Sequence, residues 1–128
     1  MRLLLDTHVF LWWIDDAPQL SAAARRAISN AANSCFFSVA SCWEIAIKLS
    51  LGKLKLATAA ETMIPEVLAA HRFELLPIEF RHVMAVASLP FHHRDPFDRL
   101  LAGQASVEGM AIVSNDAKFA AYGVKRIG

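Results

Sequence analysis

Four acidic side chains of this sequence stand in or next to apolar segments: Asp6, Glu44, Asp98 and Asp116. Carboxylates that pack together raise one another's pKa and cost stability unless a cation joins them. Mg²⁺ and Mn²⁺ prefer such oxygen ligands, whereas zinc is disfavoured because no thiol or histidine set accompanies the acids. Two such ions roughly 3.5 to 4 Å apart catalyse phosphodiester hydrolysis. If the four acids meet in the fold, they predict a metal-binding and catalytic site of the nuclease type.

The surroundings of each acid indicate where it would lie. Asp6 and Asp116 each follow a short apolar run, as expected at the carboxyl end of a buried strand. Glu44 and Asp98 lie in the first turns of predicted helices. Because ligands of open α/β sheets bind beyond the carboxyl ends of the strands, all four acids are expected to converge there.

Short apolar runs alternate with helical patterns along the whole chain. The predicted strands are residues 3–5, 35–37, 73–76, 111–113 and 124–127. The predicted helices are residues 9–14, 21–32, 41–51, 58–72, 80–89 and 96–107. This alternation predicts an α/β fold of three layers, with a mainly parallel central sheet flanked by helices. No linker, repeat or low-complexity run interrupts the pattern, so residues 1–128 are assigned to a single domain.

Each acid also has a simpler explanation when it is taken alone. Glu44 fits a capping box with Ser41, and Asp98 could be the third residue after a helix cap at Asp95. Asp116 could be an ordinary turn residue. Local roles of this kind do not account for the joint placement of four acids at one edge.

The charge balance and the hydrophobic fraction of the chain indicate which kinds of molecule it could bind. Thirteen basic residues face 12 acidic ones, a net charge of +1, and setting the four acids aside leaves a charge of about +5 that could hold a polyanion. A hydrophobic fraction of 55% and a mean hydropathy of +0.37 suggest that some apolar surface is covered by a partner. Trp12 and Trp13, in the apolar run Val9 to Ile14, are candidate anchors for a second subunit or another protein.

Cellular location follows from what the sequence lacks. No stretch approaches the roughly 18 uninterrupted apolar residues of a spanning helix, so no membrane association is expected. Asp6 and His8 interrupt the stretch most like a signal peptide. Cys35 and Cys42 form neither a disulfide framework nor a zinc site, which favours reduced thiols in a cytoplasmic protein.

Four sequence blocks, in order, carry a resemblance to a known family. They are Leu-Leu-Leu-Asp-Thr-His, Trp-Glu-Ile-Ala-Ile-Lys, His-His-Arg-Asp-Pro-Phe-Asp-Arg-Leu-Leu-Ala and Val-Ser-Asn-Asp. Together they resemble PIN-domain ribonucleases, specifically VapC-type toxins of type II toxin-antitoxin systems. The resemblance implies a PIN-like fold, endoribonuclease activity with Mg²⁺ or Mn²⁺, a homodimer, and inhibition by a small VapB-type antitoxin protein. It also assigns Asp6, Glu44, Asp98 and Asp116 to the acidic quartet of that family.

Further residues beside the acids have candidate roles. Thr7, Ser114 and Asn115 could orient the carboxylates or a metal-bound water, although turn and capping roles are equally open. A second group could contact RNA on an exposed loop at the active edge: His92, His93, Arg94 and Arg99. For that loop the alternative is plain solvation, and Arg99 could instead pair with an acid.

Three histidines and one glycine have less specific interpretations. His8, His71 and His82 are interpreted as ordinary helix residues, and Gly103 as a mild local weakening of the helix that carries Asp98.

Two other function classes remain open at this point. Acidic nuclease sites can also act on structured DNA. A receiver-like signalling domain would share the length and the α/β alternation, but it would need a second acid beside Asp6, where Thr7 stands. The sequence does not identify the RNA that would be cut, the position of cleavage, or whether Asp95 joins the site.

Overall fold

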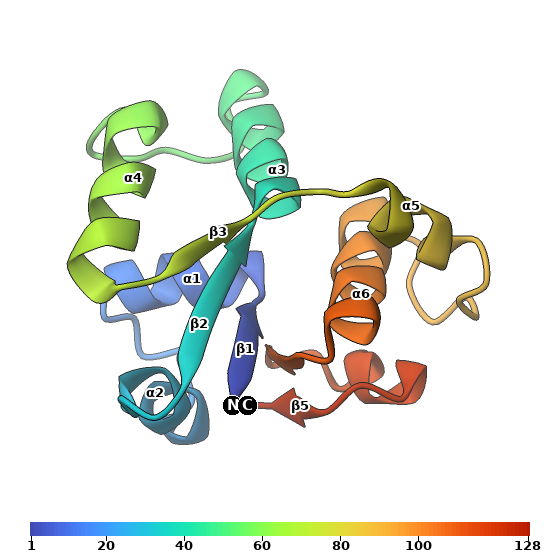
Figure 1. The fold of residues 1–128 in the computed structure, drawn as a ribbon. Helices are drawn as coiled ribbons and strands as arrows, with labels where there is room; N and C mark the ends of the chain where they lie inside the picture. Colours follow the sequence, from blue (N-terminus) through green and yellow to red (C-terminus); the bar gives the residue numbers. More distant parts are fainter.

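Five short parallel strands form the central sheet of the computed structural model, which describes residues 1–128 (Figure 1). The strands are β1 (Arg2–Leu5), β2 (Ser34–Ser38), β3 (Glu74–Leu76), β4 (Ala111–Val113) and β5 (Arg126–Ile127). Their order across the sheet is β3-β2-β1-β4-β5, and every neighbouring pair is parallel. The predicted parallel sheet is therefore confirmed.

Six helices and one 3₁₀ turn connect these strands. They are α1 (Thr7–Ile14), α2 (Ala22–Ser29), α3 (Val39–Ser50), α4 (Ala60–His71), α5 (Phe80–Val86), α6 (Pro96–Glu108) and η1 (Ala117–Tyr122). Each predicted helix is present, with shifted ends, whereas the sequence pattern did not predict η1. No helix has the length and apolar character that crossing a membrane requires.

Alternate residues of β1 face two separate cores, and this gives the three layers. Leu3 and Leu5 belong to the larger core, covered by α1, α2, α3 and α4, while Leu4 belongs to the smaller core beneath α6 and η1. Figure 1 shows α1, α2 and α4 on one side of the sheet and α5 and α6 on the other. Because both faces of the central strands are buried, Leu3–Leu5 of β1 and Ala111–Val113 of β4 are continuous apolar runs without polar alternation.

Helix starts decide where two of the acids lie. Helix α3 begins at Val39, because the Ser38 hydroxyl at the end of β2 accepts a hydrogen bond from the Ala40 N–H at 3.0 Å. The alternative interpretation of Glu44 as part of a capping box with Ser41 is therefore wrong, and Glu44 lies in the second turn of α3. At α6, the predicted cap is confirmed, since the Asp95 carboxylate accepts from the Phe97 N–H at 2.8 Å.

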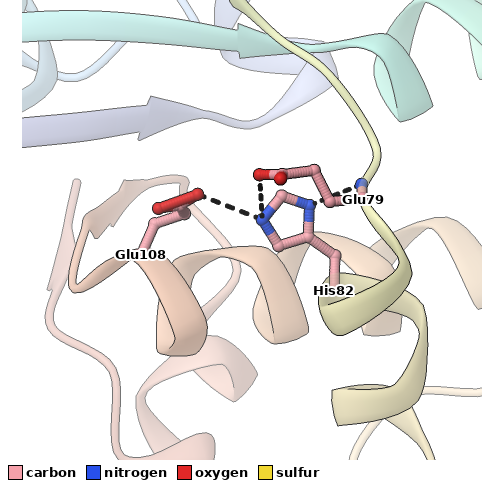
Figure 2. A group of neighbouring side chains, drawn as sticks. All are labelled: Glu79, His82 and Glu108. Atoms are coloured by element: carbon pink, nitrogen blue, oxygen red, sulfur yellow. Dashed lines mark hydrogen bonds and ion pairs between the residues drawn. The ribbon is translucent and has the colours of Figure 1, made fainter.

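A buried histidine joins the start of α5 to the end of α6. The Glu79 N–H donates to His82 Nδ1 at 3.0 Å, so the proton lies on Nε2, which is 3.2 Å from a Glu108 carboxylate oxygen (Figure 2). His82 has no exposed surface, so the prediction of an ordinary helix residue was wrong. The helix period could not show that α6 covers its imidazole.

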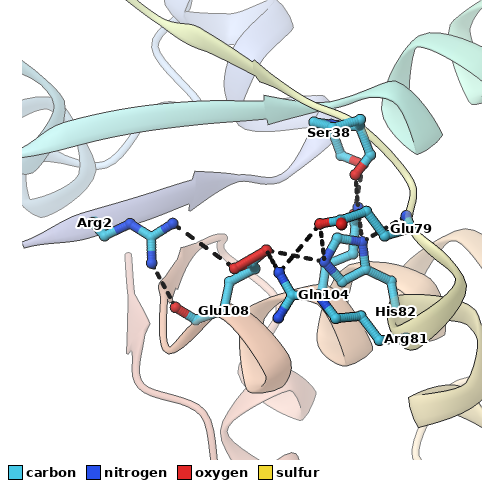
Figure 3. A network of polar contacts seen from close by, with 8 residues as sticks. Arg2, Ser38, Glu79, Arg81, His82, Gln104 and Glu108 are labelled. Atoms are coloured by element: carbon cyan, nitrogen blue, oxygen red, sulfur yellow. Dashed lines mark hydrogen bonds and ion pairs between the residues drawn. The ribbon is translucent and has the colours of Figure 1, made fainter.

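Arginine side chains neutralise the acids of this cluster, and hydrogen bonds connect the cluster to the central sheet. Arg81 lies 2.6 Å from a Glu108 oxygen, and Arg2 donates to the Glu108 carbonyl at 2.7 Å (Figure 3). Gln104 accepts from the Ser38 hydroxyl at 2.6 Å, which links α6 to the end of β2. Although Glu79, His82 and Glu108 are close enough to share a cation, arginines already pair with the acids. The cluster therefore has a structural role in docking α5 and α6.

Gly103 is required where α5 and α6 approach closely. A Cβ at this position would lie 3.2 Å from the His82 carbonyl oxygen and 3.3 Å from Val86 Cγ2, both tighter than ordinary contact. The interpretation of Gly103 as a local weakness was therefore wrong, because the residue lets two helices pack.

We predict that Gly103→Ala lowers the free energy of unfolding, although alanine is the better helix former by about 0.8 to 1 kcal/mol. The carbonyl oxygen belongs to the α5 backbone and cannot rotate away, so overpacking of about 1 to 3 kcal/mol outweighs the propensity gain. Urea denaturation measures the difference. Ser106→Ala, at an exposed position of the same helix, is the control and should be neutral or slightly stabilising. A more stable Gly103→Ala protein would contradict the packing argument.

Candidate active site

A cavity of about 380 Å³ opens at the carboxyl edge of the sheet, and all four predicted acids line it. Its lining residues are Asp6, Glu44, Asp98 and Asp116, together with Asp95, Asn115, Lys48, His8 and Trp12. The parallel strands and the starts of α3 and α6 thus bring together residues that are up to 110 positions apart, the separation of Asp6 and Asp116. Convergence at this edge is what the sequence predicted.

Asp6 is the most buried acid of the cavity, with 6% of its surface exposed. Its backbone N–H donates to the Val113 carbonyl at 3.0 Å, which extends the pairing of β1 with β4 by one residue. The Ser114 hydroxyl donates to Asp6 Oδ2 at 2.7 Å. Burial raises the pKa of Asp6 and the charge of Glu44 adds to the rise, while the Ser114 hydrogen bond opposes it.

Glu44 enters the cavity from α3 beside a lysine that the sequence analysis did not place there. Lys48 Nζ lies 3.0 Å from Glu44 Oε2, one helical turn away, and both side chains line the cavity. The spacing of four residues in Trp-Glu-Ile-Ala-Ile-Lys was the available signal. Lys48 therefore supplies a positive charge next to the acids.

Asp98 lies in the first turn of α6, where it is surrounded by like charges. Burial, followed by the charges of Asp95 and Asp6, raises the pKa of Asp98 to about 7. Asp95 caps the helix and also lines the cavity, so capping does not exclude it from the site. The geometry makes this group of carboxylates dependent on a counter-charge.

Asp116 is oriented by a buried histidine. His93 Nε2 lies 2.7 Å from Asp116 Oδ2, and His93 Nδ1 lies 2.8 Å from the Tyr122 hydroxyl, which also accepts from the His93 N–H at 3.0 Å. Partial burial alone would raise the pKa of Asp116, but hydrogen bonds from the Lys118 N–H and from His93 hold it below its usual range. Asp116 is thus more readily ionised than Asp6 and Asp98, whose pKa values are raised.

Two of the four predicted RNA-contacting residues are buried, which corrects their expected place on an exposed loop. His93 is 6% exposed and is committed to Asp116 and Tyr122. Arg99 is 8% exposed, and its guanidinium donates to the carbonyls of Pro90, Val86 and Leu89 at 2.8 to 3.3 Å. The local sequence is polar, but Arg99 of α6 donates to the loop backbone, and His93, within that loop, packs against the rings of Phe119 and Tyr122. His92 and Arg94 are exposed, as predicted.

The residues expected to orient the acids divide into three cases. Ser114 contacts Asp6 and also accepts from the Asp116 N–H at 3.0 Å, so it bridges two acids. Thr7 instead donates to the Ser41 hydroxyl at 2.8 Å and connects α1 to α3. Asn115 is exposed and lines the cavity.

His8 and Trp12 were not predicted as site residues, yet both line the cavity from α1. Their rings stack with centroids 5.8 Å apart. The spacing of four residues places them on one helix face, but only the packing of α1 turns that face toward the acids. Trp12 and Trp13 are both partly buried against the larger core.

The donor set fits a hard divalent cation. Every acid of the cavity offers carboxylate oxygens, which suit Mg²⁺ or Mn²⁺. Ligand atoms of His93, Asp98 and Asp116 lie within 4.8 Å of one another, close enough for a shared ion. Burial, and to a lesser extent the neighbouring carboxylates, raises the pKa of both Asp6 and Asp98, so a bound cation would favour their ionised forms.

We predict that the metal-free protein loses stability as pH rises from about 4 to about 7. The pKa of Asp98 is raised from 3.8 to about 7, so in this range the folded protein binds its proton more tightly than the unfolded chain does. Asp98→Asn should flatten the decline, which thermal melting in chelator across this pH range would measure. Asp95→Asn, which keeps the helix cap, should flatten it only in part. An unchanged slope in Asp98→Asn would refute this electrostatic account.

Sequence and structure similarity to known proteins identifies the family of this chain. A family model for the PIN domain matches residues 3–125. No curated protein sequence matches this chain. One similar solved structure is VapBC2 from Rickettsia felis bound to a DNA fragment from their promoter, with 17% identity, a TM-score of 0.71 and 100% coverage of both chains. The fold also resembles VapBC-1 from nontypeable Haemophilus influenzae, at 15% identity and a TM-score of 0.65, covering 98% of this chain and 96% of that one.

FitAcB from Neisseria gonorrhoeae is a third similar structure, at 14% identity and a TM-score of 0.58, with 98% of this chain and 96% of that chain covered. Identities this low establish similarity of fold alone. The family model, in contrast, spans nearly the whole sequence, from β1 to the residue before β5. This chain therefore belongs to the PIN domain family.

Proposed function

We propose that this chain is a metal-dependent endoribonuclease and the toxin of a toxin-antitoxin pair. The observation that supports this most is the meeting of Asp6, Glu44, Asp98 and Asp116 in one open cavity of a PIN domain. PIN domains are generally nucleases, and this arrangement of acids is suited to the chemistry of phosphodiester hydrolysis. The receiver-like alternative is set aside because the chain belongs to a different family.

Mg²⁺ or Mn²⁺, held by Asp6, Glu44, Asp98 and Asp116, would supply water activation and charge stabilisation at the scissile phosphate. The chain's own contribution is positioning. Ser114 holds the Asp6 carboxylate at 2.7 Å and His93 holds that of Asp116 at 2.7 Å, so neither acid is free to rotate. Such restraint keeps the ligand oxygens in one arrangement without reorganisation.

Two further contacts adapt the cavity to a phosphodiester. Lys48 balances Glu44 at 3.0 Å and carries a positive charge at the wall of the cavity. A charge of about +5 remains on the chain when the four acids are set aside, and every basic residue except the buried Arg99 is exposed or half-buried, which favours a polyanionic substrate. RNA is the substrate we propose, and structured DNA is the alternative that the experiment below must exclude.

The toxin assignment includes two partners. The similar structures from Rickettsia felis and Haemophilus influenzae are VapBC structures, and we propose a small VapB-type antitoxin for this chain as well. We also propose a homodimer. Large apolar side chains remain exposed on α5 and elsewhere: Phe80, Val83, Met84, Trp43, Leu51 and Leu75. This exposed apolar surface fits burial by a protein partner better than a solvated state.

We predict that Asp98→Asn abolishes RNA cleavage and removes most of the stabilisation by Mn²⁺. At ten times its dissociation constant, Mn²⁺ should stabilise the wild type by about 1.4 kcal/mol through linkage. Melting curves in chelator and in Mn²⁺, together with cleavage of single-stranded RNA and of flapped DNA, would measure both effects. Glu66→Gln, which removes an exposed acid of α4 outside the cavity, is the matched control and should behave as the wild type.

Two outcomes would overturn this assignment. A variant at position 98 that keeps the full Mn²⁺ shift and still cuts RNA would show that Asp98 is not a ligand. A wild type that cuts flapped DNA and spares RNA would keep the metal site but replace the substrate.

We predict that co-expression with a small protein encoded next to this gene yields a complex with suppressed cleavage. The reason is that an inhibitor of a toxin must cover or distort the acidic cavity or block access to it. Copurification followed by an RNA cleavage assay tests the prediction. A stable complex with the full activity of the free protein would argue against an antitoxin role for that partner.

A further inference from the structure

An exposed aromatic ring stands beside a second cavity that the acids alone do not explain. Phe91, in the loop between α5 and α6, is 88% exposed. It lines a cavity of about 600 Å³ that shares Asp95, Asp98 and Asp116 with the acidic cavity. The two cavities therefore meet along these acids, and a ligand at the acids can extend toward Phe91.

The Phe91 ring is supported from below by a buried cation. The guanidinium carbon of Arg99 lies 4.2 Å from the centre of the ring. Arg99 is 8% exposed and donates to the carbonyls of Val86, Leu89 and Pro90, so it cannot move away from the loop. One face of the ring is held by a cation–π contact, while most of its surface stays open. Phe91 is thus a positioned platform.

Positive charges lie on the same cavity. Arg94 and Lys118 are both exposed and line it, together with His92. Phe91 is the only apolar member of the lining. The remaining lining residues are His93 and the three acids shared with the first cavity, Asp95, Asp98 and Asp116. A surface that docks a protein through an apolar groove would present several apolar side chains, whereas an exposed aromatic ring accompanied by two cations next to the acids suits single-stranded nucleic acid.

We propose, on the basis of the function proposed above, that this second cavity binds the nucleotide next to the scissile phosphodiester, with Phe91 stacked on its unpaired base. Arg94 and Lys118 contact backbone phosphates on either side. Stacking on Phe91 requires an unpaired base, so the substrate class is single-stranded RNA or a loop of RNA. Tolerance of sequence follows, because every base offers a face to stack.

Binding and cleavage of a short single-stranded RNA test this inference separately. Phe91→Ala should weaken binding in chelator, measured by fluorescence anisotropy, by about 5- to 150-fold, the range for loss of one stacked base. In the cleavage assay, the same variant should raise KM with little change in kcat, because the acids are intact. Phe91→Tyr should restore both values, since tyrosine keeps the ring.

Phe80→Ala is the matched control, because Phe80 is 79% exposed at the start of α5 and lines neither cavity. It should leave RNA binding unchanged when light scattering gives the same molecular mass as for the wild type, a check that is needed because Phe80 also belongs to the exposed apolar surface assigned above to a protein partner. Arg94→Ala and Lys118→Ala should each reduce the salt dependence of binding by about 0.7 in the logarithmic slope, whereas Phe91→Ala should leave that slope unchanged. Equal melting temperatures of Phe91→Ala and wild type would show that the loop stays folded.

The outcomes distinguish this inference from the proposed function. RNA cleavage by the wild type with unaltered binding and KM in Phe91→Ala would overturn the stacking site and leave the nuclease assignment intact. Weakened RNA binding in Phe91→Ala would support the stacking site even if no cleavage were found. A change of molecular mass in light scattering, with RNA binding unaltered, would show that Phe91 anchors a protein contact and would overturn the inference.

Discussion

The parallel pairing of β1 with β4 is the constraint on which the candidate site depends. Leu5 lies opposite Val113, and the next residue of β1 continues the ladder when the Asp6 N–H donates to the Val113 carbonyl at 3.0 Å. Because the strands run in the same direction, Asp6 and Ser114 leave the sheet together, and their side chains meet at 2.7 Å. An antiparallel β4 would carry Ser114 and Asp116 to the opposite edge, and the acids would not form a group.

Gathering like charges at this edge has a cost, and the structure offsets only part of it. Burial and neighbouring carboxylates raise the pKa of Asp98 to about 7, which measures how unfavourable its charge is in the protein alone. Lys48 pairs with Glu44 and the His93 ring contacts Asp116, whereas no lysine or arginine forms an ion pair with Asp6 or Asp98. A divalent cation bound between these acids, as proposed above, would stabilise the folded protein.

The region between α5 and α6 shows how packing remote from the acids shapes the surface near them. Gly103 lets the two helices approach, and the buried His82 joins their ends through Glu108. This contact sets where the loop after α5 starts, and Arg99 of α6 then holds the loop through three backbone carbonyls. A buried polar network that is fully paired can specify one arrangement of helices. Here it determines where Phe91 stands relative to the cavity.

The sequence by itself determined the strands, the six α-helices, the parallel direction of the strands and which four acids would meet at the edge of the sheet. It could do so because apolar periodicity and the rule that ligands bind at the carboxyl ends of the strands both depend on local pattern. It did not determine the partners of His93 and Arg99. The sequence predicted both on an exposed polar loop, whereas in the structure only 6% of His93 and 8% of Arg99 is exposed. Nor did it place Lys48, His8 and Trp12 at the cavity. Those assignments depend on how α1, α3, α6 and the loop before α6 pack against one another, and that packing is set by contacts between residues far apart in the chain, which no local period records.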